Sequence, residues 1–197
     1  MKKGNKVLML ILCAALLVAG SVMGTLAYLT ATDDVTNTFT AGNVSITLKE
    51  REMDPATGKL VENGDLVDAI EKIKVIPNRV IDKQPVVFVN DGSEDCWLFI
   101  KVEGELLTGG AFTLNENWEA VAGQENWYRY KANDGKATAN AEGYQVFDSF
   151  TFANLTNAQV SALTDGSIVV TAYAVQYEQV NQATALTTAL GMADTNS

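Results

Sequence analysis

Apolar and polar side chains alternate along several short stretches of the chain, as they do in a β-strand that buries one face. In residues 43–50, apolar side chains stand at every second position from Val44 to Leu48, with polar residues between them. Residues 167–177 (SIVVTAYAVQY) are rich in β-branched and aromatic residues and give the clearest strand signal in the sequence. Each stretch therefore predicts a strand.

Further strands follow from apolar runs that are bounded by turn residues. Residues 84–90 (QPVVFVN) are apolar at both odd and even positions, so both faces of the strand would be apolar, as in a central strand. The run has Pro85 near its start and is followed by the turn sequence Asn-Asp-Gly-Ser at 90–93. The same reasoning predicts strands at 96–103, 127–131 and 144–152.

Helical signals are few and short. Thr156 and Asn157 precede the sequence AQVSAL, which predicts a capped helix of one or two turns with Val160 and Leu163 facing inward. Residues 181–193 space leucine and alanine for a weak amphipathic helix. The polar, turn-rich stretch 52–74 is interpreted as a long hairpin or loop insertion.

About six to eight strands with short helices and no internal repeat predict an all-β fold. We expect one domain, a β-sandwich or jelly roll spanning residues 28–197, with the 52–74 insertion and the short C-terminal helix at 181–193.

The first 27 residues predict a signal peptide rather than part of this fold. Three lysines precede an uncharged apolar run at 7–20, and small residues follow up to Ala27. Cleavage between Ala27 and Tyr28, with Thr25 at the other small position, is the expected processing step. A retained membrane helix is the alternative, because apolar character persists to Leu29.

Charge and composition narrow the classes of function. The chain of 197 residues has 14 basic and 24 acidic side chains, and residues 1–27 contribute three lysines and no acid. The expected mature chain of 170 residues thus has 11 basic side chains against 24 acidic ones, a net charge of −13. Such acidity argues against nucleic acid as a partner. The absence of histidine excludes His-based triads and the commonest zinc ligand.

Each residue that could react or bind a ligand also has a purely structural explanation. Cys96 would be the one cysteine left after cleavage and is expected to be a buried strand residue. The acidic turn 91–95 (DGSED) offers oxygen ligands for calcium but lacks EF-hand spacing, so a solvated turn is favoured. The aromatic residues Trp97, Trp118, Trp127, Tyr128 and Tyr130 are read as core residues, with a sugar-stacking platform as the alternative. We expect no catalytic residue, cofactor or metal site.

Three blocks at the start of the chain carry a family resemblance. Residues 24–30 (GTLAYLT) are followed by Asp33-Asp34 and then by 37–44 (NTFTAGNV). They closely resemble the N-terminus of the TasA/camelysin family, in which a dedicated SipW-type signal peptidase cleaves after G-T-x-A. A looser match covers 75–78 (VIPN), with Asn78 where glycine is usual, the strand regions 86–92 and 97–102 after it, and the closing strand 171–176.

The resemblance implies a jelly-roll protein that is secreted to a Gram-positive cell surface and assembles into biofilm matrix fibres. Its partners would be further copies of itself, the SipW-type signal peptidase and minor matrix subunits. In that family an N-terminal segment of one subunit adds as a strand to the next subunit. Here that segment would be residues 28–40, with Tyr28, Leu29, Val35 and Phe39 as the side chains that fill pockets.

Two other functions stay open at this stage. A monomeric adhesin or glycan-binding module could be built on the same fold. The family has also been classed as metalloendopeptidase, an activity that a chain without histidine does not support.

Overall fold

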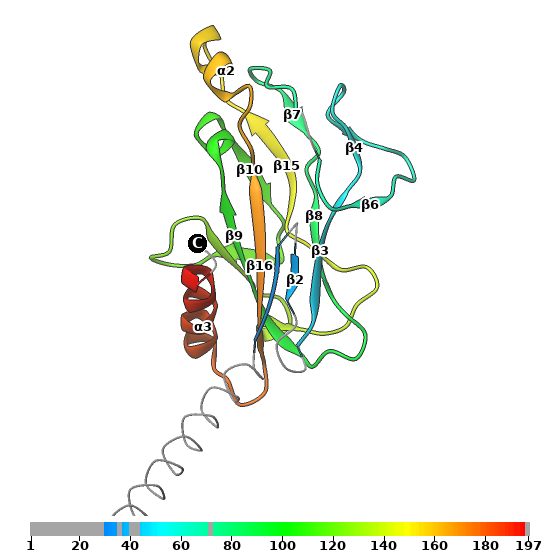
Figure 1. Cartoon of the computed structure of the whole chain (residues 1–197), viewed down its shortest axis with the longest axis vertical. Helices are drawn as coiled ribbons and strands as arrows, with labels where there is room; N and C mark the ends of the chain where they lie inside the picture. The colour runs from blue at the N-terminus through cyan, green and yellow to red at the C-terminus, as the bar shows by residue number, and fades with distance from the viewer. Residues whose placement is uncertain (1–29, 35–36, 40–43, 71–72, 196–197) are drawn as a thin grey trace, which may run out of the picture.

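Antiparallel sheets make up most of the computed structural model (Figure 1), which describes residues 30–34, 37–39, 44–70 and 73–195. Two α-helices accompany the sheets in these residues, α2 at Asn157–Leu163 and α3 at Gln182–Thr195. Two short 3-10 helices, η1 (Glu105–Gly109) and η2 (Asn133–Gly135), lie between strands. The expected all-β class with short helices is confirmed.

The largest sheet has seven strands and is centred on β9 (Cys96–Glu103) and β16 (Val169–Gln176). These two strands pair over eight residues, from Glu103 opposite Val169 to Cys96 opposite Gln176. On the β9 side, β12 (Trp127–Tyr130) pairs with β9, and β11 (Trp118–Ala120) pairs with β12. On the β16 side, β1 (Thr30–Asp34) pairs with β16, and β2 (Asn37–Phe39) pairs with β1. Strand β13 (Lys136–Ala137) also pairs with β9.

Two smaller sheets are connected by a continuous stretch of chain. The first has the order β14 (Tyr144–Gln145), β8 (Pro85–Val89), β3 (Ile46–Arg51) and β6 (Leu66–Val67). The second has the order β10 (Gly110–Leu114), β15 (Phe147–Phe152) and β7 (Val80–Ile81). Val146 links β14 to β15 and donates its N–H to the Pro85 carbonyl at 2.9 Å, so the chain passes from one sheet into the other with its backbone bonded.

A hydrophobic cluster joins the four-stranded sheet to the inner face of the seven-stranded sheet. Leu48 and Val87 of the smaller sheet belong to the same buried cluster as Ile100 and Ala172 of the larger one. The alternation predicted for residues 43–50 is confirmed, because Val44, Ile46 and Leu48 are all buried while the residues between them are half-exposed. Burial of apolar side chains from two facing sheets is the main stabilising term for this arrangement.

Helix α3 covers the other face of the seven-stranded sheet (Figure 1). Its buried residues are the alanines Ala185, Ala189 and Ala193, which recur every four residues and lie against aromatic side chains of β9, β12 and β16. Small side chains on one helix face let the helix backbone approach the sheet closely. The helix begins after Asn181, whose side-chain oxygen accepts the Thr184 N–H at 3.0 Å.

Helix α2 has the predicted cap. The Thr156 hydroxyl oxygen accepts the Gln159 N–H at 3.4 Å, and the Gln159 side chain accepts the Thr156 N–H at 2.9 Å. Leu163 is buried and Val160 half-buried, as the sequence predicts. Leu163 packs in a third cluster with Phe150 and Phe152 of β15.

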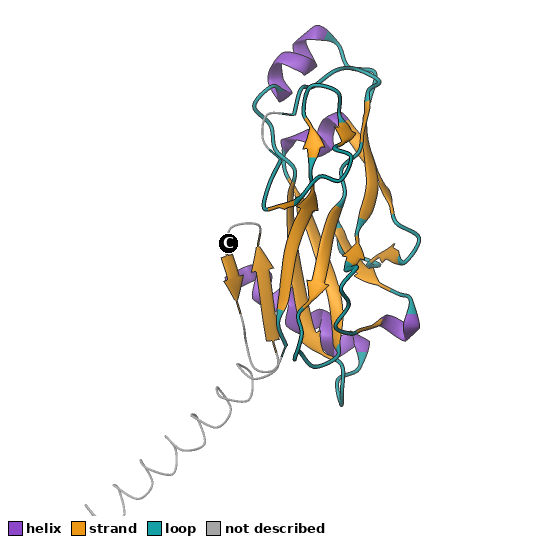
Figure 2. Ribbon diagram, turned by 90° about the vertical axis from the view of Figure 1, so that its right-hand side faces the viewer, coloured by secondary structure: helices purple, strands orange, loops and turns teal. Residues whose placement is uncertain are grey.

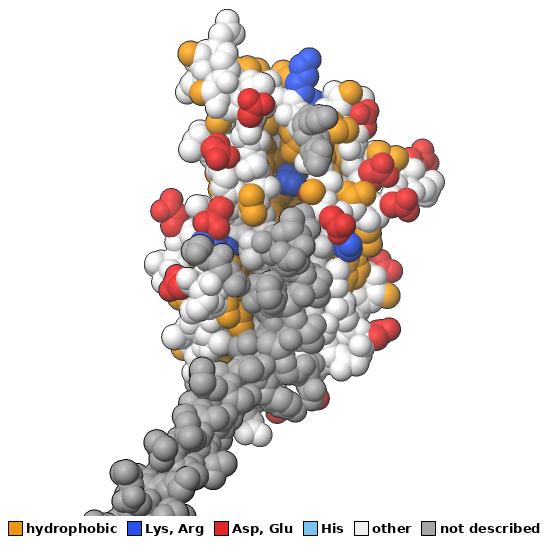
Figure 3. Space-filling model, viewed as in Figure 1, with side chains coloured by type: hydrophobic (Ala, Val, Ile, Leu, Met, Phe, Trp, Pro, Cys, Tyr) orange, Lys and Arg blue, Asp and Glu red, His pale blue; other side chains and the backbone are white. Residues whose placement is uncertain are grey.

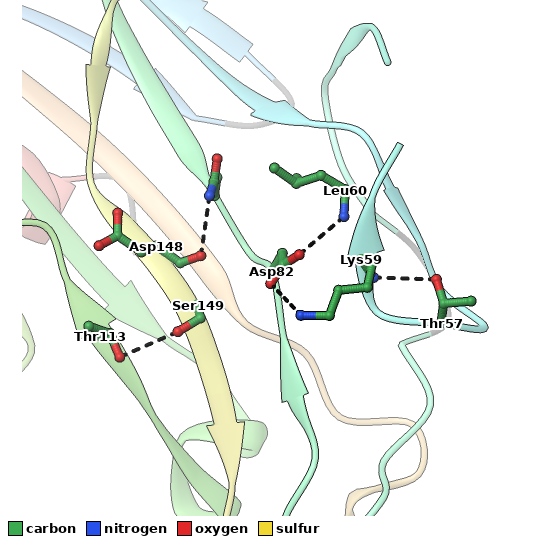
Figure 4. Close-up of polar contacts among 8 residues, drawn as sticks. Thr57, Lys59, Leu60, Asp82, Thr113, Asp148 and Ser149 are labelled. Atoms are coloured by element: carbon green, nitrogen blue, oxygen red, sulfur yellow. Dashed lines mark hydrogen bonds and ion pairs between the residues drawn. The ribbon is translucent and has the colours of Figure 1, made fainter. Parts of the chain in front are cut away.

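The polar stretch 52–74 contains the hairpin of β4 (Met53–Asp54) and β5 (Lys59–Leu60) as well as β6. Asp82 holds the hairpin in place, because its carboxylate accepts the Lys59 Nζ at 3.0 Å and the Leu60 N–H at 3.3 Å (Figure 4). Gly58 in the hairpin turn has φ +71°, and a Cβ there would lie 2.6 Å from Ile81. The hairpin therefore packs closely onto β7 through a position that requires glycine.

Candidate functional site

The N-terminal strand β1 lies along one edge of β16. Five residues pair in antiparallel register, from Thr30 opposite Val175 to Asp34 opposite Thr171. Strand β2 then folds back on β1, with Phe39 opposite Thr32. Figure 2 shows this hairpin at one side of the sheet. Residues from the two ends of the chain thus meet in a single sheet.

The strand that receives β1 is apolar on both faces. Val170, Ala172 and Ala174 face the cluster between the sheets, while Tyr173 and Val175 face the cluster under α3. A strand buried on both faces needs a hydrogen-bonding neighbour on each edge, because buried backbone groups without partners are costly. Strand β9 occupies one edge of β16, and β1 occupies the other.

Strand β1 also runs near the second sheet. Cα atoms of β1 and β3 lie within 8 Å of each other. Strand β3 pairs with β8 from Ile46 to Glu50, whereas β6 pairs with it only at Glu50 and Arg51. The N-terminal strand therefore lies where the edges of both sheets come together.

Most residues predicted to act in cleavage or strand donation lie outside the described residues. This applies to Thr25, Ala27, Tyr28, Leu29 and Val35. Phe39 lies in β2, and the structure brings its backbone beside Thr32 of β1. The structure adds what the sequence did not indicate, namely the strand that accepts the segment 30–34.

Cys96 is a buried strand residue, as expected. It is fully inaccessible at the start of β9, and burial together with the Asp95 charge raises the pKa of its thiol to about 12. A thiol with such a pKa stays protonated at neutral pH and is a poor nucleophile.

The tryptophans belong to the core and do not form an exposed stacking platform. Trp97, Trp118 and Trp127 are each less than 10% exposed. The indole N–H of Trp97 donates to the Val180 carbonyl at 2.9 Å, and that of Trp118 donates to the Gln145 carbonyl at 2.8 Å. Tyr128 and Tyr130 are half-buried, and burial raises the pKa of both phenols. The interpretation as core is confirmed for the three tryptophans, while the two tyrosines pack against the core and remain partly exposed.

The acidic segment 91–95 adopts a turn that is held by hydrogen bonds and an ion pair. The Ser93 hydroxyl oxygen accepts the Ser45 N–H at 3.0 Å, and Asp95 pairs with Lys136 at 2.6 Å. The Asp95 carboxylate raises the pKa of the Lys136 ammonium. Within the described ranges, no group of three or more His, Cys, Asp or Glu side chains is placed to hold a metal ion.

One charged pair was not anticipated from the sequence. Glu50 and Lys83 are buried, and the Lys83 Nζ lies 2.5 and 2.7 Å from the two carboxylate oxygens. They line a cavity of about 60 Å³ together with Ile168 and Val170, at the start of β16. The available signal was the alternation itself, which places Glu50 on the same face of its strand as Leu48.

Comparison of the chain with protein-family models, with curated proteins and with solved structures finds no match. Among the helices that the structure describes, none is long and apolar enough to cross a membrane.

Proposed function

We propose that this protein is a secreted structural subunit that assembles into extracellular matrix fibres by N-terminal strand donation. The observation that carries the proposal is the pairing of β1 with β16. The donated segment would be residues 28–40 after cleavage behind Ala27, and the acceptor would be the edge of β16 in another copy. The fold in this proposal is a single β-sandwich domain of the jelly-roll type.

The same register can form within one chain or between two chains. A segment that pairs with its own β16 at Thr171–Val175 can exchange for the equivalent segment of a neighbour without any change in local contacts. Each subunit would then give one strand and receive one strand. Such a head-to-tail contact does not close on itself and produces a filament.

Processing would control this exchange. The signal segment 1–27 precedes the donor strand directly, so cleavage releases the end that must move. The dedicated SipW-type signal peptidase is the proposed processing partner, and minor matrix subunits would be further partners. Acidic side chains scattered over the surface (Figure 3) would keep free subunits apart until pairing outweighs their repulsion.

The alternative functions lose their particular support. The adhesin alternative relied on exposed tryptophans, which are buried. The metalloendopeptidase alternative needs a metal site, and the sequence contains no histidine to build one of the usual zinc sites.

Paired cysteines test the exchange directly. Ala31 and Ala174 are opposite each other in β1 and β16, and opposite residues of antiparallel strands lie within the Cα distance of a disulfide. One preparation would carry Ala31→Cys and the other Ala174→Cys, both starting at Tyr28. Mixing them under oxidising conditions should give disulfide-linked dimers as fibres form. The control pairs Ala31→Cys with Val169→Cys, five residues away along β16, and should give none.

The double variant Ala31→Cys, Ala174→Cys provides the complementary result. An intrachain disulfide would lock β1 onto its own β16, and fibres should then appear only after reduction. Negative-stain microscopy and size-exclusion chromatography give the readout. Unchanged fibres from a chain lacking residues 28–38 would refute strand donation, and a stable monomer under all conditions would refute fibre assembly.

A further inference from the structure

A groove on the outer face of the four-stranded sheet has the lining of a small ligand site. The face of β3 and β8 opposite to the core carries Thr47 and Phe88, which lie directly opposite each other, with Lys49 beyond them. This groove has a volume of about 330 Å³. Its described lining residues lie in β3, β6, β8 and the segments 90–91 and 140–141 rather than in β1 or β16, so the groove is a separate feature from the β1–β16 pairing.

Two walls define the groove. Leu66 of β6 stands on one side and is 45% exposed, and residues Asn140 and Ala141 stand on the other. Asn140 and Ala141 precede β14, which pairs with β8, whereas β6 pairs with β3, so the two walls flank the β3–β8 floor from opposite sides.

The aromatic ring on the floor is held by a close backbone contact. Gly143 has φ +69°, and a Cβ there would lie 2.8 Å from Cε1 of Phe88. Phe88 therefore has one side against this turn and remains half-buried. An aromatic ring fixed in this way offers an apolar surface to the C–H groups of a ligand.

The polar groups of the groove are fixed amides and a hydroxyl. Asn90 Oδ1 accepts the Thr47 hydroxyl at 3.0 Å, and Asn90 Nδ2 donates to the Ser45 hydroxyl oxygen at 2.9 Å. On the opposite wall, Asn140 Oδ1 accepts the Glu142 N–H at 3.0 Å. Each amide retains hydrogen-bonding capacity beyond these bonds.

The charges that line the groove and the backbone pairing of its floor strands indicate which class of ligand it can bind. Among the described residues that line the groove, one is a lysine, Lys49, which pairs with Asp68, and one is an aspartate, Asp91, so this lining favours neither anions nor cations. The floor strands are paired with each other, and the Asn90 N–H donates to the Ser45 carbonyl at 2.9 Å. An extended peptide would find no free strand edge on this floor, because its backbone groups are already bonded.

We propose that this groove binds a neutral oligosaccharide, with Phe88 and Leu66 as the apolar surface and Asn90 and Asn140 as hydrogen-bonding groups. Uncharged amides beside an aromatic ring match the alternating hydroxyl and C–H faces of a sugar. The proposal assigns a binding site distinct from the buried tryptophans.

The probes are three neutral tetrasaccharides, namely cellotetraose, maltotetraose and tetra-N-acetylchitotetraose. NMR titration of the ¹⁵N-labelled mature chain should shift the side-chain amide signals of Asn90 and Asn140 with at least one of them. Phe88→Leu keeps an apolar side chain but removes the ring, and should weaken binding about tenfold. Asn140→Ala should weaken it as well.

Tyr177→Leu is the matched control, because Tyr177 is a half-buried aromatic residue outside the groove, with its ring 4.6 Å from that of Trp97 in the seven-stranded sheet. It should leave the affinity unchanged. Circular dichroism and thermal unfolding check that each variant folds, and Leu66→Ser provides a second groove variant if Phe88→Leu does not. Absence of any shift with all three probes would overturn the proposal, as would binding that the groove variants leave intact.

Discussion

Glu50 of β3 and Lys83, in the segment between β7 and β8, form a buried ion pair with the lysine Nζ within 2.7 Å of both carboxylate oxygens. Breaking such a pair leaves one charge buried and uncompensated. We expect Lys83→Met to lower the free energy of unfolding by about 3–5 kcal/mol, measured by urea denaturation.

The matched control for that variant is Lys59→Met. Lys59 pairs with Asp82 at 3.0 Å but is mostly exposed, and an exposed pair contributes about 0–1 kcal/mol. The double variant Glu50→Leu, Lys83→Met should recover most of the stability lost in the single one. Equal losses from Lys59→Met and Lys83→Met would contradict the buried-pair interpretation.

Gly135 is expected to tolerate no side chain. Its φ is +82°, and a Cβ would lie 2.3 Å from the Trp97 ring. Gly135→Ala should therefore lower the free energy of unfolding by about 2–4 kcal/mol, the sum of backbone strain and overpacking. Gly123 has a similar φ of +77° with open space around its Cβ position, so Gly123→Ala isolates the backbone term and should cost about 1 kcal/mol. Thermal unfolding of both variants provides the comparison.

Helix α3 should be sensitive to side-chain volume on one face only. Ala189 is fully buried against the sheet, whereas Ala183 is exposed in the same helix. Ala189→Leu should destabilise the protein by about 1–3 kcal/mol, because a larger side chain forces the helix away from the aromatic residues beneath it. Ala183→Leu should be within about 0.5 kcal/mol of the parent. If both changes were neutral in chemical denaturation, α3 would not be packed as described.

The Cys96 thiol should make stability fall at alkaline pH. The pKa is about 12 in the folded chain against an ordinary value of 9.0, so the unfolded state loses its proton first as the pH rises. The contribution of Cys96 is thus fully present below pH 9 and is lost between pH 9 and 12. Cys96→Val should show a shallower decline in the free energy of unfolding over that interval. In the native protein the thiol should also resist Ellman's reagent at pH 8 and react once urea unfolds the chain.

The elements predicted best from the sequence are those whose signal is local. Strand β9 occupies the predicted range 96–103, because a run of five apolar residues from Cys96 to Ile100 marks most of it. The cap of α2 was also predicted, from Thr156 and Asn157 before a short apolar pattern, and the structure adds Gln159 as the second half of the capping box. Strand β10 was missed, because its first residue Gly110 follows another glycine and its pattern is short.

The buried ion pair and the groove depend on contacts between residues far apart in sequence. The alternation places Glu50 on a buried face, but nothing local identifies Lys83 as its partner. The groove needs Phe88, Leu66 and Asn140 to converge from three segments. Asn78 is an intermediate case. It adopts φ +59°, a conformation that asparagine tolerates better than most residues, but the sequence alone does not reveal that the backbone takes it there.

The pairing of β1 with β16 restricts the order in which the strands of the large sheet can form. Thr30 can pair with Val175 only after the chain has been synthesised as far as Val175, so β1 cannot enter the sheet until β16 is present. Contacts of such long sequence separation form slowly. In the proposed export and assembly, the N-terminal segment would therefore be available before its own β16 is, while a folded neighbouring subunit would already present the edge of its β16.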